Sequence, residues 1–199
     1  MTETFNLDLF HLLNASAHPP ALILAAALLL AQWAVYLVPL ALTGAWLWGR
    51  PAWRGTLLHS ALTGLLALGV NQVIGLLYYH PRPSTMGVGH TFLPHAPDSS
   101  FPSDHATLIW AVGLSLLPER RLRSLAAALF ILGWGVAWAR VYVGVHFPLD
   151  MAGALAVALF SVTLCWPPCA RLSHGALPGL QRLYQHLFAV LIRRGWVRE

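Results

Sequence analysis

The sequence predicts an all-α membrane protein, a polytopic bundle of five to six transmembrane helices with interfacial helices at both ends. The first observation is composition: 57% of the 199 residues are hydrophobic and 10% are charged, whereas soluble domains carry about a quarter charged residues. The second observation is that the apolar residues gather in runs long enough to cross a bilayer. The mean hydropathy of +0.62 agrees with both, so a water-soluble globule is excluded.

The first two runs have the length of membrane spans. Residues 21 to about 46 contain no charged side chain, and a helix of that length crosses about 30 Å of hydrocarbon at about 1.5 Å per residue. Residues 57–79 form the second run, in which the polar side chains are His59, Ser60, Thr63, Asn71 and Gln72. We therefore expect two spanning helices.

Three shorter runs follow. Residues 106–117 come directly after a polar loop, so their helix is expected to begin inside the bundle, below the membrane surface. Residues 125–139 form a similar run. The last run, 151–166, follows Pro148, and proline suits the first turn of a helix. Five spans result, and because no polar linker divides them, residues 1–199 are expected to form a single domain.

The two ends of the chain have amphipathic patterns. Residues 5–13 place Phe5 and three leucines on one helical face, and residues 180–191 align four leucines in the same way. Such patterns are typical of helices that lie at the membrane interface. The alternative for the C-terminal segment is a sixth, short span, but its apolar core, residues 187–192, is brief. We favour the interfacial helix.

Two further features concern processing and cysteine chemistry. Glu3 and Asp8 precede the first apolar run and no basic residue does, so the charge pattern of a cleaved signal peptide is absent and the first span is expected to stay attached. Cys165 and Cys169 are too few for a disulfide framework or a four-ligand zinc site. We interpret them as structural.

The arginines predict the orientation in the membrane. All twelve basic residues are arginine, and the net charge is +5. Ten of them follow the first, third and fifth spans: Arg50, Arg54, Arg120, Arg121, Arg123, Arg171, Arg182, Arg193, Arg194 and Arg198. By the positive-inside rule these segments are cytoplasmic and contact anionic lipid, so no nucleic-acid partner is expected. The N-terminus and the loops 80–104 and 140–149 then lie on the outer face.

Ionisable residues gather on this outer face. One loop contributes an arginine, a carboxylate and a histidine, and the second loop contributes the same three types: Arg82, Asp104 and His105, then Arg140, His146 and Asp150. Ionisable groups at membrane depth usually face a cavity or a partner and indicate a functional site. Because six of them fall on one side, we treat the cluster as the candidate site.

The loop before residue 106 has the features of an anion site. Ser103 is placed to cap the helix that begins near Asp104, where free backbone N–H groups and the positive end of the helix dipole attract an anion. Arg82 and Arg140 add fork-shaped donors that match phosphate oxygens. We therefore expect a phosphorylated ligand.

The two histidines fit phosphoryl transfer. Four residues separate His146 from Asp150, so the carboxylate can accept a hydrogen bond from one imidazole nitrogen and leave the other as nucleophile. His105, from the other loop, can supply the proton for the leaving oxygen.

These residues resemble the three signature motifs of the type 2 phosphatidic acid phosphatase superfamily. The matching segments are Arg82-Pro83, Pro102-Ser103-Asp104-His105 and Arg140-x5-His146-x3-Asp150. The order of the motifs and their place beside membrane spans match as well. Within the superfamily, the segments around the three motifs look most like those of the bacterial undecaprenyl pyrophosphate phosphatases.

The resemblance implies a metal-independent phosphatase without a cofactor. His146 would form a phosphohistidine, Asp150 would orient it, and His105 would act first as acid and then as base. The phosphoryl oxygens would be held by backbone amides and by the side chains of Arg82, Arg140 and Ser103, with Asp104 beside them. Asn71, Gln72 and Pro83 are further candidates for the site.

The implied substrate is a polyprenyl pyrophosphate in a bacterial cytoplasmic membrane, hydrolysed on the outer side so that the carrier lipid returns to cell-wall synthesis. Two alternatives stay open. One is a related phosphatase acting on phosphatidylglycerophosphate, phosphatidic acid or lipid A phosphate. The other is a non-catalytic protein that binds or transports a lipid phosphate. The sequence gives no indication of the oligomeric state.

The chain departs from the superfamily pattern at three positions. Gly75 stands where the pattern has lysine, and Asn71 or Gln72 could face the site instead or could join helices. Asp104 replaces the usual glycine, which places a negative charge beside the phosphate site unless it pairs with an arginine or a cation. Ala139 replaces serine, which removes a minor contact.

Three further histidines, His80, His90 and His95, lie in a loop rich in proline and glycine. Their spacing is not that of metal ligands. We interpret them as solvated or as contacts to lipid headgroups.

Overall fold

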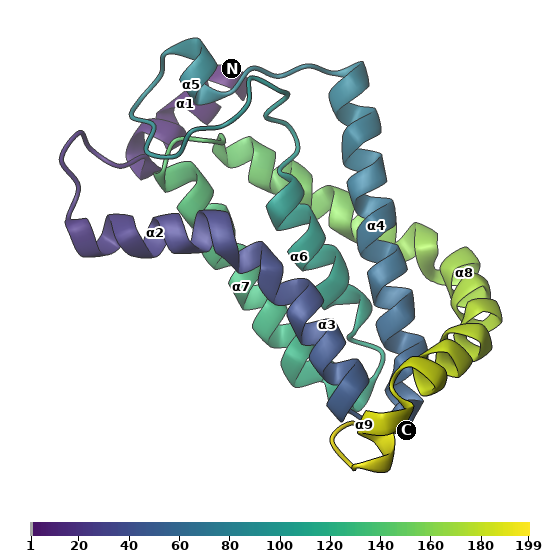
Figure 1. Cartoon of the computed structure of the whole chain (residues 1–199). Coiled ribbons are helices and arrows are strands. Elements are labelled where there is room, and N and C mark those ends of the chain that lie inside the picture. The colour runs from purple at the N-terminus through teal and green to yellow at the C-terminus, as the bar shows by residue number, and fades with distance from the viewer. Residues whose placement is uncertain (1) are drawn as a thin grey trace.

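The computed structural model describes residues 2–199, which contain helices and loops and no strand. The helices are α1 (Thr2–Leu13), α2 (Ala21–Trp33), η1 (Ala34–Tyr36), α3 (Leu37–Trp48), η2 (Pro51–Trp53), α4 (Arg54–Leu77), α5 (Pro83–Met86), α6 (Asp104–Ser115), η3 (Arg120–Leu122), α7 (Arg123–Tyr142), α8 (Pro148–Leu187) and α9 (Ala189–Arg193). The all-α fold class is confirmed. Figure 1 shows the helices gathered in a bundle, with long loops at the end where the N-terminus lies.

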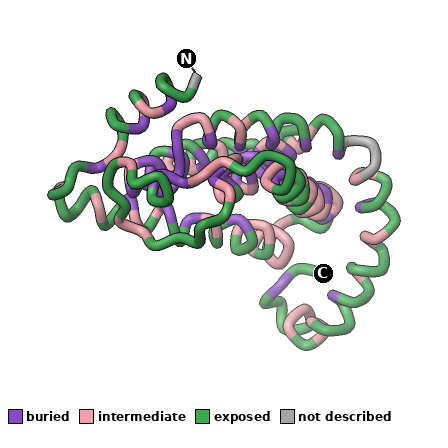
Figure 2. Tube along the Cα trace, turned by 90° about the horizontal axis from the view of Figure 1, so that it is seen from above, coloured by how far each residue is buried: buried purple, intermediate pink, exposed green. Residues whose placement is uncertain are grey.

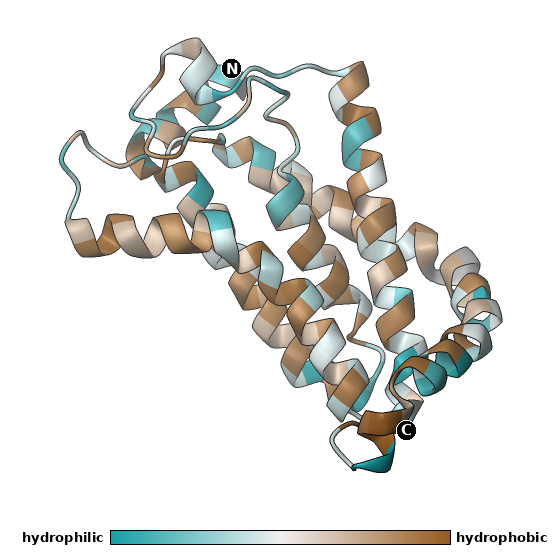
Figure 3. Cartoon of the chain, in the orientation of Figure 1, coloured by the Kyte–Doolittle hydropathy of each residue, from teal (hydrophilic) through white to brown (hydrophobic). Residues whose placement is uncertain are grey.

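Four helical segments are long and apolar enough to cross a membrane, counted over the described residues. They are Ala21–Trp48, Pro51–Leu77, Arg120–Tyr142 and Pro148–Cys165. Four of the five predicted spans therefore have the expected length, and the chain is a multi-pass membrane protein. Figure 3 shows mostly hydrophobic residues along the middle of these helices and hydrophilic residues toward the loops.

The third predicted span, α6, is the shortest of the five and is largely buried. It has 12 residues, a length of about 18 Å, and it packs against α4, α7 and α8 (Figure 1). Ala106, Ile109 and Trp110 are fully buried. Because neighbouring helices surround it, α6 starts inside the bundle, as the sequence indicated, and holds its first residues at the depth of the site.

The first span is bent rather than straight. A 3-10 turn, Ala34–Tyr36, separates α2 from α3, and the two helices run in different directions in Figure 1. The bend has a cause in Pro39, which lacks an N–H and whose ring crowds the carbonyl of Val35, four residues earlier. The uniform apolar run from residue 21 to about 46 predicted one continuous spanning helix, so the bend is a difference from the prediction.

Most of the predicted C-terminal helix belongs to α8, and a short helix, α9, follows it. α8 extends over 40 residues to Leu187, well past the predicted end of the fifth span, and its last part leaves the bundle and turns back toward it (Figure 2). The chain end returns to the helix ends near α3, where Arg198 N–H donates to the Leu47 carbonyl at 2.8 Å. The Tyr184 hydroxyl donates to the Arg198 carbonyl at 2.6 Å.

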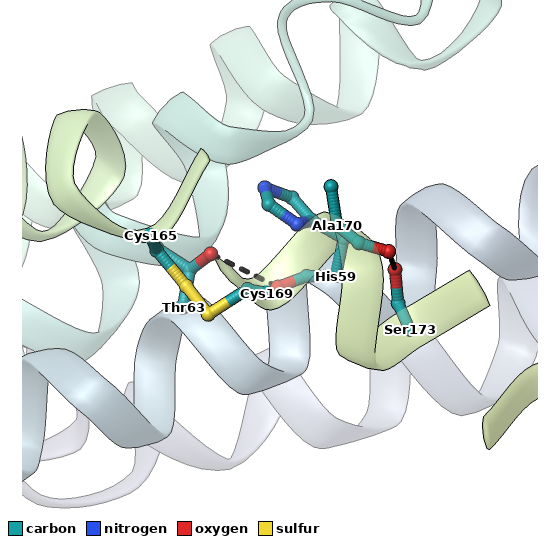
Figure 4. Close-up of a disulfide and its surroundings, with 6 residues drawn as sticks. All are labelled: His59, Thr63, Cys165, Cys169, Ala170 and Ser173. Carbon is teal, nitrogen blue, oxygen red and sulfur yellow. Dashed lines mark hydrogen bonds between the residues drawn. A yellow bond between two sulfur atoms is a disulfide. The ribbon is translucent and has the colours of Figure 1, made fainter. Parts of the chain in front are cut away.

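The two cysteines interpreted as structural are joined to each other within α8. Cys165 and Cys169 form a disulfide one helical turn apart. Figure 4 shows it beside His59 and Thr63 of α4. It therefore lies where α8 passes α4.

Candidate active site

A cavity of about 380 Å³ lies where the loops 78–103 and 143–147 meet the bundle. Its walls come from α4, the loop before α6, the first turn of α6, the end of α7 and the turn before α8. It brings together five of the six ionisable residues that the sequence singled out: Arg82, Asp104, His105, Arg140 and His146. The sixth, Asp150, lies directly behind His146.

The pair His146 and Asp150 is fixed by the start of α8. Pro148 begins the helix, which places Asp150 on its first turn, where Oδ2 accepts from the Phe147 N–H at 2.8 Å. The same oxygen lies 3.2 Å from His146 Nδ1 and accepts from the Ser100 hydroxyl. Both members of the pair are almost completely buried. The carboxylate is therefore held in place by contacts other than the imidazole that it orients.

The other imidazole nitrogen faces two arginines. His146 Nε2 lies 3.2 Å from Arg82 Nη1 and 3.2 Å from Arg140 Nη2. A guanidinium can only donate, so Nε2 accepts and the ring proton resides on Nδ1, facing Asp150. The nitrogen with the free electron pair is therefore the one that points between the two cationic groups.

The charge state of His146 follows from its surroundings. Burial is the main effect that lowers the pKa of His146, to about 3, and the hydrogen bond to Asp150 opposes it. The charges of Arg140 and Arg82 lower the pKa further. The imidazole is therefore neutral near pH 7, which a nucleophilic nitrogen requires.

Each arginine is anchored so that its guanidinium stays at the cavity. Arg82 donates to the Val145 carbonyl at 2.9 Å and to Asp98 Oδ1 at 2.7 Å. Arg140 donates to the Ala31 carbonyl of α2 at 2.7 Å. These contacts give both arginines a local structural role at the cavity.

The pKa of the loop carboxylate Asp98 is set mainly by Arg82 and by burial. Burial acts to raise the pKa of Asp98, but the hydrogen bond and the charge of Arg82 outweigh it, and the pKa is lowered overall. Asp98 is therefore ionised near pH 7 and ties the loop to Arg82.

The start of α6 differs from expectation at Ser103. This residue occupies the N-cap position, but its side chain makes no capping hydrogen bond, so the predicted cap is wrong. Ser103 N–H is instead directed to the Asp150 carbonyl at 3.4 Å, and the buried Oγ has no hydrogen-bond partner in the described part of the chain. The hydroxyl, together with the first amides of α6, which lack intrahelical acceptors, is free for a ligand.

Asp104 pairs with amides rather than with an arginine. Asn71 Nδ2 donates to Oδ1 at 2.8 Å, and Gln72 Nε2 donates to Oδ2 at 3.2 Å. Asn71 also donates to Thr107 Oγ1 at 3.0 Å. The two amides line the cavity and also join α4 to α6. The sequence offered these two roles as alternatives, and the structure combines them.

Two of the candidate positions are less central. Pro83 is buried at the start of α5, next to Arg82, and is not part of the cavity wall. Gly75 is in the wall, and a Cβ atom added to it would lie 3.6 Å from Ser99 Cβ. Because Gly75 has no side chain, the cavity is wider here and lacks the cationic group of the superfamily pattern.

Sequence reasoning missed three polar residues at the site. Ser100 contacts both His146 and Asp150. His80 Nδ1 lies 3.7 Å from Asp150 Oδ1, and the ring of His95 lies 6.4 Å from that of His146 and lines the cavity. The interpretation of His80 as solvated is therefore wrong, because the loop folds back over the bundle and leaves this residue half-buried. His90 and His95 are both exposed, and His95 also lines the cavity.

The fold and the site together define a helical membrane protein with a buried histidine whose Nε2 lies between two arginines. The profile of the PAP2 superfamily matches residues 56–170, more than half of the chain. The chain therefore belongs to the PAP2 superfamily and is a membrane phosphatase.

Two relatives are similar over most of their length. YbjG of Escherichia coli (strain K12) is 38% identical over 202 aligned residues, which cover 100% of both chains. The undecaprenyl-diphosphatase BcrC of Bacillus subtilis (strain 168) is 33% identical over 154 residues, 77% of this chain and 79% of its own.

Two crystal structures share the fold. LpxE of Aquifex aeolicus superposes with a TM-score of 0.63 at 22% identity, covering 81% of this chain and 94% of its own. A PAP2-type phosphatidylglycerolphosphate phosphatase of Bacillus subtilis gives a TM-score of 0.59 at 20% identity, covering 82% and 84%. At this identity they support the helical architecture alone.

Proposed function

We propose that this protein hydrolyses undecaprenyl pyrophosphate to undecaprenyl phosphate and inorganic phosphate. The observation that carries the proposal is the neutral His146, whose Nε2 is directed between Arg82 and Arg140. The substrate follows from the relatives: YbjG and BcrC are both named as undecaprenyl-diphosphatases, and YbjG aligns over the whole chain.

In the first step, the Nε2 electron pair of His146 attacks the terminal phosphorus. The bond from that phosphorus to the bridging oxygen breaks, and its electrons stay on the oxygen of the departing undecaprenyl phosphate. The imidazolium form of His105 gives that oxygen a proton and becomes neutral. Asp150 accepts the Nδ1–H hydrogen bond and stabilises the positive charge that develops on the ring.

In the second step, water attacks the phosphohistidine. His105 takes a proton from the water, the P–N bond breaks, and the electron pair returns to Nε2. Throughout, Arg82, Arg140, the Ser103 hydroxyl and the first amides of α6 bind the phosphoryl oxygens, where negative charge gathers in the transition state. The mechanism requires no metal.

The location follows from the charge pattern. The arginine-rich ends of the helices lie on the cytoplasmic side, so the cavity opens on the outer side of the bacterial cytoplasmic membrane. Undecaprenyl pyrophosphate that polymer synthesis leaves there is hydrolysed, and the undecaprenyl phosphate that forms returns to the carrier pool. We propose further that residues 1–199 act as one domain, because α1 and the chain end both contact the bundle.

Phosphate release by the purified protein in a chelator tests the proposal. Undecaprenyl pyrophosphate, phosphatidylglycerophosphate and phosphatidic acid are compared side by side, with His146→Ala as control. We expect the fastest turnover with the polyprenyl substrate and none in the variant. Preference for a glycerolipid would keep the mechanism and overturn the substrate. No release from any of them, together with no trapped phosphohistidine, would favour binding or transport.

A further inference from the structure

The loop before α6 carries a second histidine–carboxylate pair. His95 Nδ1 lies 3.5 Å from Asp98 Oδ1 and 3.3 Å from the Ala96 carbonyl. Both neighbours accept hydrogen bonds, so the Nδ1 side of the ring faces acceptors, as it does in His146. The ring lines the cavity, and its centre lies 6.4 Å from the centre of the His146 ring.

This pair is fixed relative to the phosphate site rather than free on a loop. Asp98 also accepts from Arg82 Nε at 2.7 Å, and Arg82 Nη2 donates to the Ser99 carbonyl at 3.3 Å. The same guanidinium contacts His146 through Nη1. Arg82 thus sets the distance between the two histidines.

A diphosphate places its phosphates at different distances from His146. The terminal phosphorus must approach Nε2 to about 3 Å for attack, and the lipid-linked phosphorus follows one oxygen bridge further out. The arginines and Ser103 donate hydrogen bonds to the oxygens of the terminal phosphate. The lipid-linked phosphate needs partners of its own on the wall of the cavity.

Few groups on that wall can bind a second phosphate. The amide N–H groups of Asn71 and Gln72 are directed to Asp104, whose carboxylate repels an anion. His95 offers an imidazole whose Nε2 is not directed to Asp98. Because Nδ1 faces acceptors, Nε2 can donate to a phosphate oxygen only when the ring is the imidazolium, a charge that the bound phosphate and Asp98 both stabilise.

We propose that His95 binds the lipid-linked phosphate of a diphosphate and thereby selects diphosphates over phosphate monoesters. The inference rests on the proposed function, in that the terminal phosphate is the one attacked by His146. A monoester has no phosphate at this place and gains nothing from His95.

The test compares His95→Gln with wild type and with His90→Ala, a matched control for an exposed histidine of the same segment. Inhibition by methylenediphosphonate and by orthophosphate is measured during undecaprenyl pyrophosphate hydrolysis. We expect His95→Gln to raise the inhibition constant of the diphosphonate about tenfold, with that of orthophosphate within about twofold. The value of kcat/KM should fall by a similar factor, and His90→Ala should change neither.

Other outcomes overturn the inference. If the inhibition constants of both inhibitors changed equally, His95 would have a structural role. If neither inhibition constant changed, His95 would not contact the bound diphosphate. A wild-type protein that binds the diphosphonate no better than orthophosphate would have no second phosphate site. Failure of the proposed function is distinct, because it is seen as a wild-type preference for glycerolipid substrates.

Discussion

The neutral state of His146 is the residue-scale property with the most direct test. Its pKa is lowered to about 3 from 6.5, so we expect no titration of this imidazole between about pH 5.5 and 8. Nitrogen NMR of histidine-labelled protein, with His146→Gln to assign the signal, reads both the charge and the Nδ1–H tautomer. A midpoint near the ordinary histidine value would contradict the buried geometry.

The same shift has a consequence for stability. Between pH 6.5 and about 3 the unfolded chain binds a proton on His146 that the folded chain does not. Folding stability therefore falls as the pH is lowered through this window. The contribution is absent above it, where the imidazole is neutral in both states.

Arg140 is the second residue with a sharp prediction, because it uses two N–H groups in different directions. One reaches the Ala31 carbonyl and the other reaches His146 Nε2. A lysine has a single ammonium and cannot reproduce the fork, so Arg140→Lys should lower kcat/KM about a hundredfold. Arg120→Lys, at an exposed position, is the control. Equal activities would show that the fork is not used.

Asp104, unlike Arg140, is expected to weaken the binding of phosphate. Its carboxylate is held by Asn71 and Gln72 at the edge of the cavity and repels phosphate. Asp104→Asn should therefore lower the inhibition constant of orthophosphate about threefold, a modest change because water screens the charge. A higher or unchanged constant would mean that the carboxylate does not act on the bound anion.

Residues that share a short motif were predictable, and residues brought in from elsewhere were not. His146 and Asp150 stand four positions apart at a helix start, where spacing alone puts them in contact. Ser100 reaches the same pair from 46 and 50 positions away, and His95 enters because Arg82 holds its loop. Ser103 was placed correctly at a cap position, but the direction of a hydroxyl depends on neighbours that sequence patterns do not specify.

At the scale of elements, the turn between α7 and α8 is the critical connection. Gly144 has φ +80°, a left-handed conformation that costs other residues about 1–2 kcal/mol, and a Cβ there would overlap the His90 carbonyl. Gly144→Ala should lower the melting temperature and displace His146, with a loss of activity.

Gly179 provides the matched control for this turn. It lies within α8 and has no atom within 4 Å of a Cβ position, so Gly179→Ala should be neutral or slightly stabilising. Thermal unfolding and phosphate release on both variants decide the matter. Equal melting temperatures would show that the turn tolerates a side chain.

Helix positions were predicted well, whereas their ends and bends were not. The apolar runs located α4, α6 and α7, because the length and apolar composition of a run can be read from the sequence. The bend before α3 depends on one proline inside an otherwise uniform run. α8 continues to Leu187 because the return of the chain end gives its last part a partner, which is a tertiary contact between Tyr184 and Arg198.

At the scale of the whole molecule, the two ends of the bundle have different chemistry. Arg54 lies under Trp46 and Tyr184 at 5.4 and 4.6 Å from the ring centres and donates to the Arg198 carbonyl at 2.8 Å, so it belongs to the end where the chain terminus docks. The cavity belongs to the other end. Most arginines of the chain follow the spans that end on the Arg54 side, which is the asymmetry that orients membrane proteins.

The orientation is tested by labelling in intact cells. In a variant without Cys165 and Cys169, single cysteines replace Thr85, which is exposed in α5, or Ala52, which is exposed between α3 and α4. A membrane-impermeant maleimide should label the first in intact cells and the second only after lysis, because α5 lies with the cavity and residue 52 with the arginine-rich end. The reverse pattern would place the cavity in the cytoplasm. Undecaprenyl pyrophosphate released outside would then be out of its reach, and the proposed recycling role would fail even if the chemistry at His146 were intact.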